Sequence, residues 1–476
     1  MKRKSGVLMH ISSLPGDYSC GSFGKAAKKF IDFLADCGFS YWQVLPFCPV
    51  DEYNSPYKSH STFAGNPYFI DLENLFEKGL IARDELDGAK QNSPYLCEFE
   101  RLSTERLTLL LKASKRVNNI EEIKEFISEN PYIEDFCRFM ALKTANNDTQ
   151  WQDWENGNYD SDILFMWQFI QYEFFAQWKD IKAYANNRGI KVIGDIPFYV
   201  SPDSADVWAN KNLFQLDMRG MPTSVAGVPP DYFSEDGQLW GNPLYNWDKM
   251  KTNGYRWWLD RIDFMLKIFD GLRIDHFRAF ESYWSVPAGE KTAKNGQWIK
   301  GPGMDLIAKI KEVAGDKLII AEDLGHITEE VEKLVEDSGF PGMRVFQFGF
   351  FGVESTHMPH NYKNNCIAYA GTHDNNTLLG YLWELDDKNR RCMLEYCGYT
   401  DADWTQGLSA MQRTIWQSAA GVVIFTIQDL LKYGSDTRLN YPGRAENNWR
   451  YRVTQEQINS INKEEYCRLN EIYYRI

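Results

Sequence analysis

The chain has 476 residues, a length that suits about three domains or one barrel that carries insertions. A formal net charge of −14 argues against a nucleic-acid partner, and no apolar run is long enough for a signal peptide or a membrane span. The nine cysteines are scattered without a CxxC pair, so we expect no zinc site, no disulfide framework and a cytoplasmic location.

The first elements form a strand–helix–strand unit. Residues 7–9 are a short apolar strand, and apolar side chains at helical spacing in residues 30–37 predict a helix that Gly38 terminates. Residues 41–46 predict the second strand, which a proline stops. A short connection between these elements is typical of a parallel βαβ unit.

Two long insertions follow. Residues 51–160 contain several amphipathic patterns and are interpreted as a helical insertion after strand two. A long helix over 167–184 then leads into a third strand, 190–197. Residues 200–250 are rich in turn residues and aromatic rings, which indicates a loop-like insertion that lies over the active site as a lid.

Five more strands complete the pattern, separated by helical segments. Eight short apolar strands, each followed by a helix or an insertion, predict an α/β fold, a single catalytic (β/α)₈ barrel over 1–476. The alternative, an open doubly wound sheet, is disfavoured because no strand is followed by a glycine-rich phosphate turn. The five later strands are predicted at 271–278, 318–322, 343–348, 367–371 and 422–426.

Residues 271–278 are the stretch around which the chain is organised. Read as a strand, they place Arg273 and Asp275 on one face and His276 on the other. Two opposite charges on a short apolar segment are costly to bury unless they are paired or used. The guanidinium should lower the pKa of Asp275, which suits an ionised nucleophile, although an ordinary ion pair would look the same.

Acidic side chains also follow other strands, at the edge where barrel enzymes carry their chemistry. Adjacent strands lie about 4.8 Å apart, so carboxylates at their ends can approach the roughly 5–5.5 Å separation of a retaining glycosidase. Glu322 has Ile320, not a cation, two residues earlier, which predicts a raised pKa and the acid role. The predicted strand ends carry His10, Asp195, Asp275, Glu322, His373 and Asp374.

Each acid alone has a plainer interpretation as an ion pair or a helix cap, and Asp374 in particular could cap the helix that follows it. Three acids at barrel strand ends, one with its own arginine, favour catalysis. A metal site is disfavoured, because the seven histidines form no HExxH motif and no other short-spaced ligand pair.

The motifs resemble a known family. Arg273-x-Asp275-His276, Glu322-Asp323-Leu324-Gly325 and His373-Asp374 are similar to the catalytic signatures of the α-amylase clan. Further motifs narrow the resemblance to the amylomaltases, which are 4-α-glucanotransferases or disproportionating enzymes. These motifs lie at 12–16, 55–57, 194–197, 228–233, 240–243, 341–344 and 371–375.

The resemblance implies a role for each matching residue. Asp275 would be the nucleophile, Glu322 the acid/base and Asp374 the transition-state stabiliser, with maltooligosaccharides and α-1,4-glucans as donor and acceptor and no cofactor. Two positions depart from the family pattern, Arg444 and Asn376. The substrate-binding residues would be Arg273, His373, Tyr57, Asp195, Trp240, Tyr232, Phe233, Ser55, His276 and Asn440.

Two other functions stay open from the sequence, a hydrolytic amylase and a non-catalytic oligosaccharide-binding barrel. A transferase must keep water from its covalent glucosyl-enzyme, and the insertion carrying Tyr232 and Phe233 would offer apolar rings to an acceptor sugar. The three intact acids argue against a non-catalytic barrel.

Overall fold

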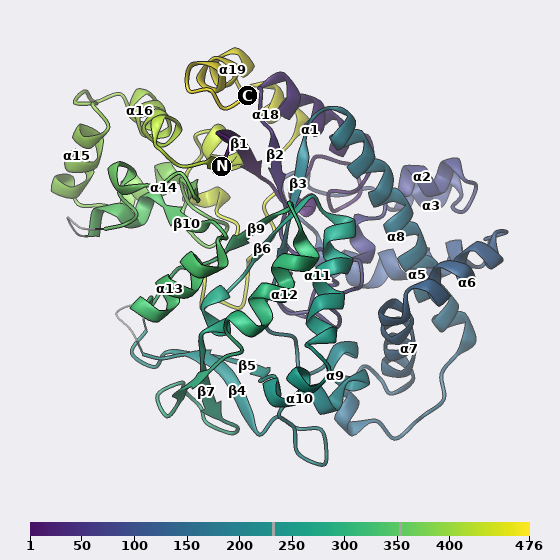
Figure 1. Ribbon diagram of the computed structural model, residues 1–476. Helices are drawn as coiled ribbons and strands as arrows, with labels where there is room; N and C mark the ends of the chain where they lie inside the picture. Colours follow the sequence, from purple (N-terminus) through teal and green to yellow (C-terminus); the bar gives the residue numbers. More distant parts are fainter. Residues whose placement is uncertain (231–233, 352–354) are drawn as a thin grey trace.

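A closed barrel of eight parallel strands forms the centre of the molecule (Figure 1). The computed structural model describes residues 1–230, 234–351 and 355–476. The strands are hydrogen-bonded around the barrel in the order β1-β12-β11-β10-β9-β6-β3-β2, which confirms the predicted (β/α)₈ fold. Their bounds are β1 Lys4–Leu8, β2 Tyr41–Gln43, β3 Lys191–Ile196, β6 Gly271–Ile274, β9 Leu318–Ala321, β10 Gly342–Val345, β11 Cys366–Tyr369 and β12 Val422–Thr426.

The helices between the strands surround the barrel, as Figure 1 shows for α8, α11, α12 and α13. The first, α1, buries Phe30 and Leu34 and ends before Gly38, whose φ of 73° continues the chain in a left-handed turn. A capping box of Thr454 and Gln457, which is recognisable from the sequence, begins α18. The helices between and after the barrel strands, outside the two insertions, are α1 Lys25–Asp36, α8 Ser161–Asn187, α11 Arg256–Ile268, α12 Met304–Ala314, α13 Glu329–Ser338, α14 Leu378–Glu384, α15 Asp387–Tyr396, α16 Trp404–Gln417, α17 Ile427–Leu430, α18 Gln455–Asn459 and α19 Lys463–Ile472.

Helices also fill the region between β2 and α8, where the sequence predicts an insertion. Figure 1 shows them grouped beside α8, away from the barrel axis. The division of the chain into a barrel, an insertion at 51–160 and a lid at 200–250 stays a prediction. The helices are α2 Leu72–Glu77, α3 Arg83–Gly88, α4 Phe99–Arg101, α5 Leu107–Ser114, α6 Ile120–Glu129 and α7 Pro131–Ala145.

The segment after β3 is rich in loops, as predicted for 200–250, but it also contains helices and strands. Two short helices, α9 Ala205–Ala209 and α10 Trp247–Thr252, flank β4 Ser224–Val228 and β5 Gln238–Pro243. An antiparallel sheet forms in the order β5-β4-β7-β8, with β7 Ser282–Pro287 and β8 Gln297–Lys300 from beyond β6. No local sequence pattern predicts this sheet, because β4 pairs with β7 and the barrel strand β6 lies between the two in the chain.

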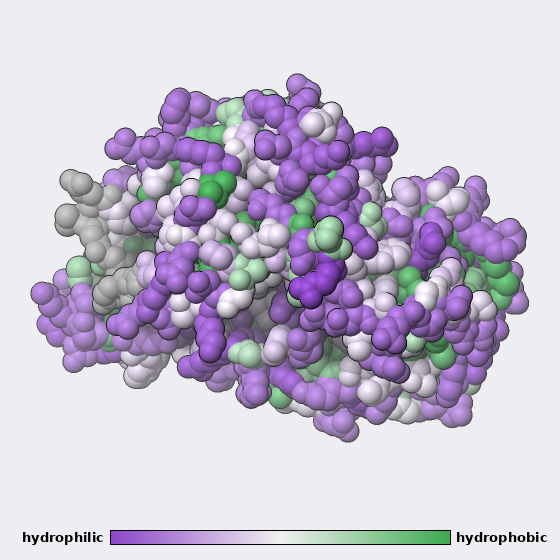
Figure 2. Space-filling model, turned by 90° about the horizontal axis from the view of Figure 1, so that it is seen from below, coloured by the Kyte–Doolittle hydropathy of each residue, from purple (hydrophilic) through white to green (hydrophobic). Residues whose placement is uncertain are grey.

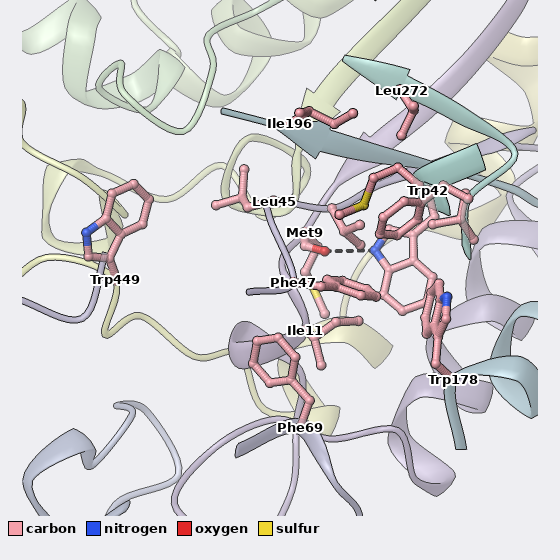
Figure 3. Packing of buried hydrophobic residues seen from close by; sticks show 14 of the residues in the cluster. Met9, Ile11, Trp42, Leu45, Phe47, Phe69, Trp178, Ile196, Leu272 and Trp449 are labelled. Atoms are coloured by element: carbon pink, nitrogen blue, oxygen red, sulfur yellow. Dashed lines mark hydrogen bonds between the residues drawn. The ribbon is translucent and has the colours of Figure 1, made fainter. Parts of the chain in front are cut away.

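Two clusters of buried apolar residues make up the core. One consists of alternate residues of the barrel strands, such as Leu8, Ile193 and Ile320, and fills the barrel interior. The larger cluster joins the helices to the strands, and Figure 3 shows a part of it. There the Trp42 indole nitrogen donates a 2.7 Å hydrogen bond to the Met9 carbonyl oxygen, so the buried ring keeps a polar partner.

Candidate active site

An open cleft of about 530 Å³ lies at the carboxyl ends of the barrel strands. Figure 2 looks onto this side of the molecule, where a mostly hydrophilic surface surrounds a hollow near the centre. Carboxylates and flat rings line the cleft together, an arrangement that suits the polar edges and apolar faces of sugars. Its lining includes Asp275, Asp374, Tyr57, Trp240, Tyr441 and Trp449.

A buried arginine joins two acids at the base of the cleft. The register of β3 and β6 pairs Asp195 with Arg273, and the Arg273 Nη1 lies 2.9 and 2.8 Å from the two Asp195 oxygens. The Nη2 of the same guanidinium lies 2.7 Å from an Asp275 oxygen. The Asp195 side chain has no exposed surface, whereas that of Asp275 is 30% exposed. Asp275 is therefore the member of this group that can meet a ligand.

Arg273 lowers the pKa of Asp275 as predicted, but the net shift of that pKa is upward. Burial raises the pKa of Asp275 above its ordinary value, and the charges of Asp195 and Asp374 add to this effect. Arg273 opposes it only in part, because one guanidinium serves two carboxylates.

The backbone turns sharply after Ile274, so the predicted strand over 271–278 is too long. His276 has a φ of 53°, which is rare for a residue with a side chain, and it does not continue the strand pleat. Its amide nitrogen donates a 2.7 Å hydrogen bond to Glu322 Oε2, and its ring meets the Trp240 ring edge-on at 4.9 Å between centroids. The turn after β6 thus contacts both the residue that follows β9 and the strand β5 of the antiparallel sheet.

Glu322 follows β9 and is held by two backbone amides. Besides the His276 amide, the Leu324 amide donates to Glu322 Oε1 at 2.8 Å. These bonds favour the ionised form, but burial and the neighbouring charge of Asp275 outweigh them and raise the pKa of Glu322 to about 7. A carboxyl with this pKa can both give and take a proton near neutral pH.

Asp374 follows β11, lines the same cleft as Asp275 and has partners of its own. His373 Nε2 is 3.3 Å from one oxygen, and the Asn440 amide donates to the other at 2.6 Å. Burial would raise the pKa of Asp374, but these two contacts hold it well below its usual range. Asp374 does not cap the following helix, since the Thr377 hydroxyl accepts the hydrogen bond of the Gly380 amide at the start of α14.

Tyr57 contacts both Asp195 and His373. Its hydroxyl donates a 2.8 Å hydrogen bond to Asp195, and its ring stacks on His373 with centroids 5.0 Å apart and planes 15° apart. The Ser55 hydroxyl oxygen accepts a bond from the Tyr57 amide nitrogen at 3.3 Å. This loop therefore fixes the ring where it lines the cleft.

Three of the predicted site residues, Asp195, Arg273 and Glu322, are not in the cleft lining but contact Tyr57, Asp275 and His276, which are. The other described residues predicted for the site line the cleft. Tyr232 and Phe233 lie outside the described residues. His10, another strand-end residue, is not part of the cleft lining; its Nδ1 accepts a hydrogen bond from the Leu45 amide, and burial lowers its pKa to about 3.

Sequence reasoning missed two neighbours of Asp374 and His373. The Trp449 ring lies 5.9 Å from the His373 ring and lines the cleft. Arg438 donates a 2.6 Å bond to the Asp374 carbonyl oxygen. The only feature of the sequence that could have indicated Arg438 is its position two residues before Asn440, a predicted substrate-binding residue. In the described ranges no three potential ligand side chains gather as a metal site, and no helix is long and apolar enough to cross a membrane.

A (β/α)₈ barrel with carboxylates of contrasting pKa in an aromatic-lined cleft defines an enzyme of the glycoside-hydrolase class. Comparison with known proteins gives the family. Residues 9–457 match the model of glycoside hydrolase family 77, described as 4-alpha-glucanotransferase, and the chain belongs to this family.

Similar proteins cover the whole chain. A 4-alpha-glucanotransferase of Streptococcus pneumoniae is 43% identical and aligns with 100% of this chain and 98% of its own length. A 4-alpha-glucanotransferase of Thermus thermophilus is 41% identical, with 95% of each chain covered. The solved structure of an amylomaltase from Streptococcus agalactiae in complex with acarbose is 38% identical, has a TM-score of 0.96 and covers 100% of both chains.

Proposed function

We propose that Asp275, Glu322 and Asp374 carry out a retaining transfer of α-1,4-glucan segments between maltooligosaccharides in this 4-α-glucanotransferase. The observation that carries the proposal is the contrast in pKa. Glu322, whose carboxylate contacts the amide of the lining residue His276, has a pKa of about 7, whereas that of Asp374 in the cleft lining is held far below its usual range. When the surroundings of neighbouring carboxyl groups push their pKa values apart, the group with the raised pKa can act as the proton donor and the group with the lowered pKa stays ionised.

In the first step the exposed Asp275 oxygen attacks the anomeric carbon of the donor while Glu322 protonates the leaving glycosidic oxygen. This step requires the proton on Glu322 and the charge on Asp275, and the contact with Arg273 favours the ionised form of Asp275. The ionised Asp374 stabilises positive charge that develops on the sugar ring. Glu322 then deprotonates the 4-hydroxyl of an acceptor glucan, which displaces Asp275 and restores the configuration.

The acceptor must compete with water for the glucosyl-enzyme. Residues Gln238, Leu239 and Trp240 at the start of β5 line the cleft, which supports the proposal that the insertion at 200–250 contributes to the substrate site. Acceptor stacking by Tyr232 and Phe233 stays a prediction, since both lie outside the described residues. The side chains that we propose to bind substrate are those of Tyr57, Trp240, Ser55, His276, His373 and Asn440.

We also infer a cytoplasmic enzyme of maltodextrin and glycogen metabolism that acts without a cofactor and has no nucleic-acid or membrane partner. The nine cysteines are all unpaired, which agrees with a reducing compartment. The net charge of −14 disfavours binding to a phosphate backbone.

Product analysis with maltotriose tests the transferase against a hydrolase. We expect glucose and longer maltodextrins with almost no net gain of reducing ends, because each cleaved bond is replaced by a new one. Changing Asp275 to Asn in the same assay shows which products depend on the site. Reducing ends that rise in step with bond cleavage would indicate an amylase.

A further inference from the structure

A cluster of thiols lies outside the cleft, where the segment after β1 meets the helical insertion. Cys97 Sγ donates to the Ser12 carbonyl oxygen at 3.3 Å, and the Gly21 amide donates to the same oxygen at 3.1 Å. The Glu98 amide donates to the Ser19 carbonyl oxygen at 3.0 Å, so the chain segments that carry Cys20 and Cys97 are paired and the two thiols are neighbours. Both side chains are buried and unpaired.

Two buried arginines adjoin these thiols. Arg106 and Arg452 have 5% and 0% exposure, and their guanidinium groups donate only to neutral oxygens, such as those of Tyr18 and Gly16. Across the parts of the chain that the structure describes, neither forms an ion pair with a carboxylate. Buried charges without a counter-charge are costly, so the fold favours an anion here.

Cys20 is the group that can supply this anion. Burial would raise the pKa of its thiol, but the hydrogen bond from Cys97 and the charges of Arg452 and Arg106 bring it below its ordinary value. Burial and the neighbouring Cys20 raise the pKa of Cys97 instead. The pair thus combines a thiol that ionises more readily than usual with one that keeps its proton, the arrangement that disulfide chemistry uses.

A small cavity of about 20 Å³ is lined by Tyr18, Ser19 and Arg106 among others, so it lies beside the chain segment that leads into Cys20. Roughly 10–15 Å³ of such space holds a water molecule. The cavity therefore suits an oxidant close to water in size and is too small for a peptide disulfide such as oxidised glutathione.

We propose that Cys20 and Cys97 form a peroxide-reactive pair that hydrogen peroxide converts into a disulfide. The Cys20 thiolate attacks one peroxide oxygen, so that an S–O bond forms, the O–O bond breaks and the departing hydroxide takes up a proton to become water. The Cys97 sulfur then attacks the Cys20 sulfur, the S–O bond breaks, and the hydroxide leaves as water with the Cys97 proton. The two sulfurs lose two electrons and the peroxide gains them.

The disulfide would fasten a segment that leads to the cleft. The Cys97 amide donates to the Arg450 carbonyl oxygen at 2.7 Å, and Leu96 forms an antiparallel bridge with Tyr451. Trp449, which precedes this segment, lines the cleft beside His373. Oxidation would thus tie the segment after β1, the insertion and the chain that carries Trp449 together.

Stepwise addition of hydrogen peroxide to the reduced wild-type protein tests the proposal without any variant. Intact mass should fall by two hydrogens, and peptide mapping without reductant should find Cys20 linked to Cys97 at a peroxide dose that leaves the exposed Cys392 unmodified. Dithiothreitol should restore the original mass. Oxidation of Cys392 while Cys20 and Cys97 stay reduced would overturn the proposal.

Two variants separate the roles, and thermal melting verifies that each is folded. Cys97→Ala should stop the reaction at a sulfenic acid on Cys20, which dimedone traps. Cys20→Ala should leave Cys97 unmodified at the same dose. A dimedone adduct on Cys97 in Cys20→Ala, or none on Cys20 in a folded Cys97→Ala protein, would contradict the assignment.

Discussion

Asp275 and Asp374 both reach the cleft, yet their environments shift their pKa values in opposite directions. Asp275 has the stronger cation beside it, but Arg273 also pairs with the buried Asp195. Asp374 has an imidazole and an amide that contact no second carboxylate among the described residues. The effect of a cation on the pKa of a carboxylate therefore depends on how many anions share that cation, and not on contact alone.

The largest effect should follow from Asp275→Asn. The amide cannot form the covalent glucosyl-enzyme, so we expect a loss of at least about 10⁴-fold in kcat with maltotriose. The Arg273 contact keeps an oxygen acceptor, and the melting temperature should stay close to that of the wild type. Near-normal activity in a folded Asp275→Asn protein would remove Asp275 from the mechanism.

Glu322→Gln should cost about 10²–10⁴-fold with natural glucans, the usual span for general acid–base catalysis. Glucosyl fluoride needs no acid for the first step, so the variant should still accumulate an adduct on Asp275, which mass spectrometry detects. Wild-type kcat/KM should fall as the pH rises through about 7, because the acid loses its proton there. Persistence of this decline in the variant, or an adduct on another residue, would argue against Glu322.

The smallest effect is expected from the loss of a hydrogen-bond partner of Asp374. Asn440→Ala removes one of the two contacts that hold the Asp374 pKa down, and a hydrogen bond to a charged group contributes about 1.5–3 kcal/mol. We expect kcat/KM to fall roughly 10- to 100-fold, since 1.4 kcal/mol is a factor of ten.

Asn242→Ala is the matched control for this change. Asn242 lines the same cleft, but its amide donates to the Val200 carbonyl oxygen at 2.8 Å and not to a carboxylate. It should lose less activity than Asn440→Ala. Equal losses in the two variants would mean that Asn440 acts through the shape of the cleft and not through Asp374.

Much of the fold could be predicted because its signals are local. Apolar runs mark the barrel strands, and Gly38 and the Thr454 capping box mark helix ends that the structure confirms. The left-handed turn at His276 has no such signal, since no glycine stands there. The sheet that joins β4 to β7 also escaped prediction, because its strands come from both sides of β6 in the chain.

The sequence by itself determined which acidic groups stand at the strand ends, because the order of strands and helices dictates the barrel and places those ends at one edge. Only the tertiary structure decided their charges. Asp195 faces Arg273 through the pairing of β3 with β6, and Glu322 acquires its pKa from burial and from Asp275 on the neighbouring strand. A pKa depends on every charge within a few ångströms and on the loss of water, and both are set only when distant segments pack together.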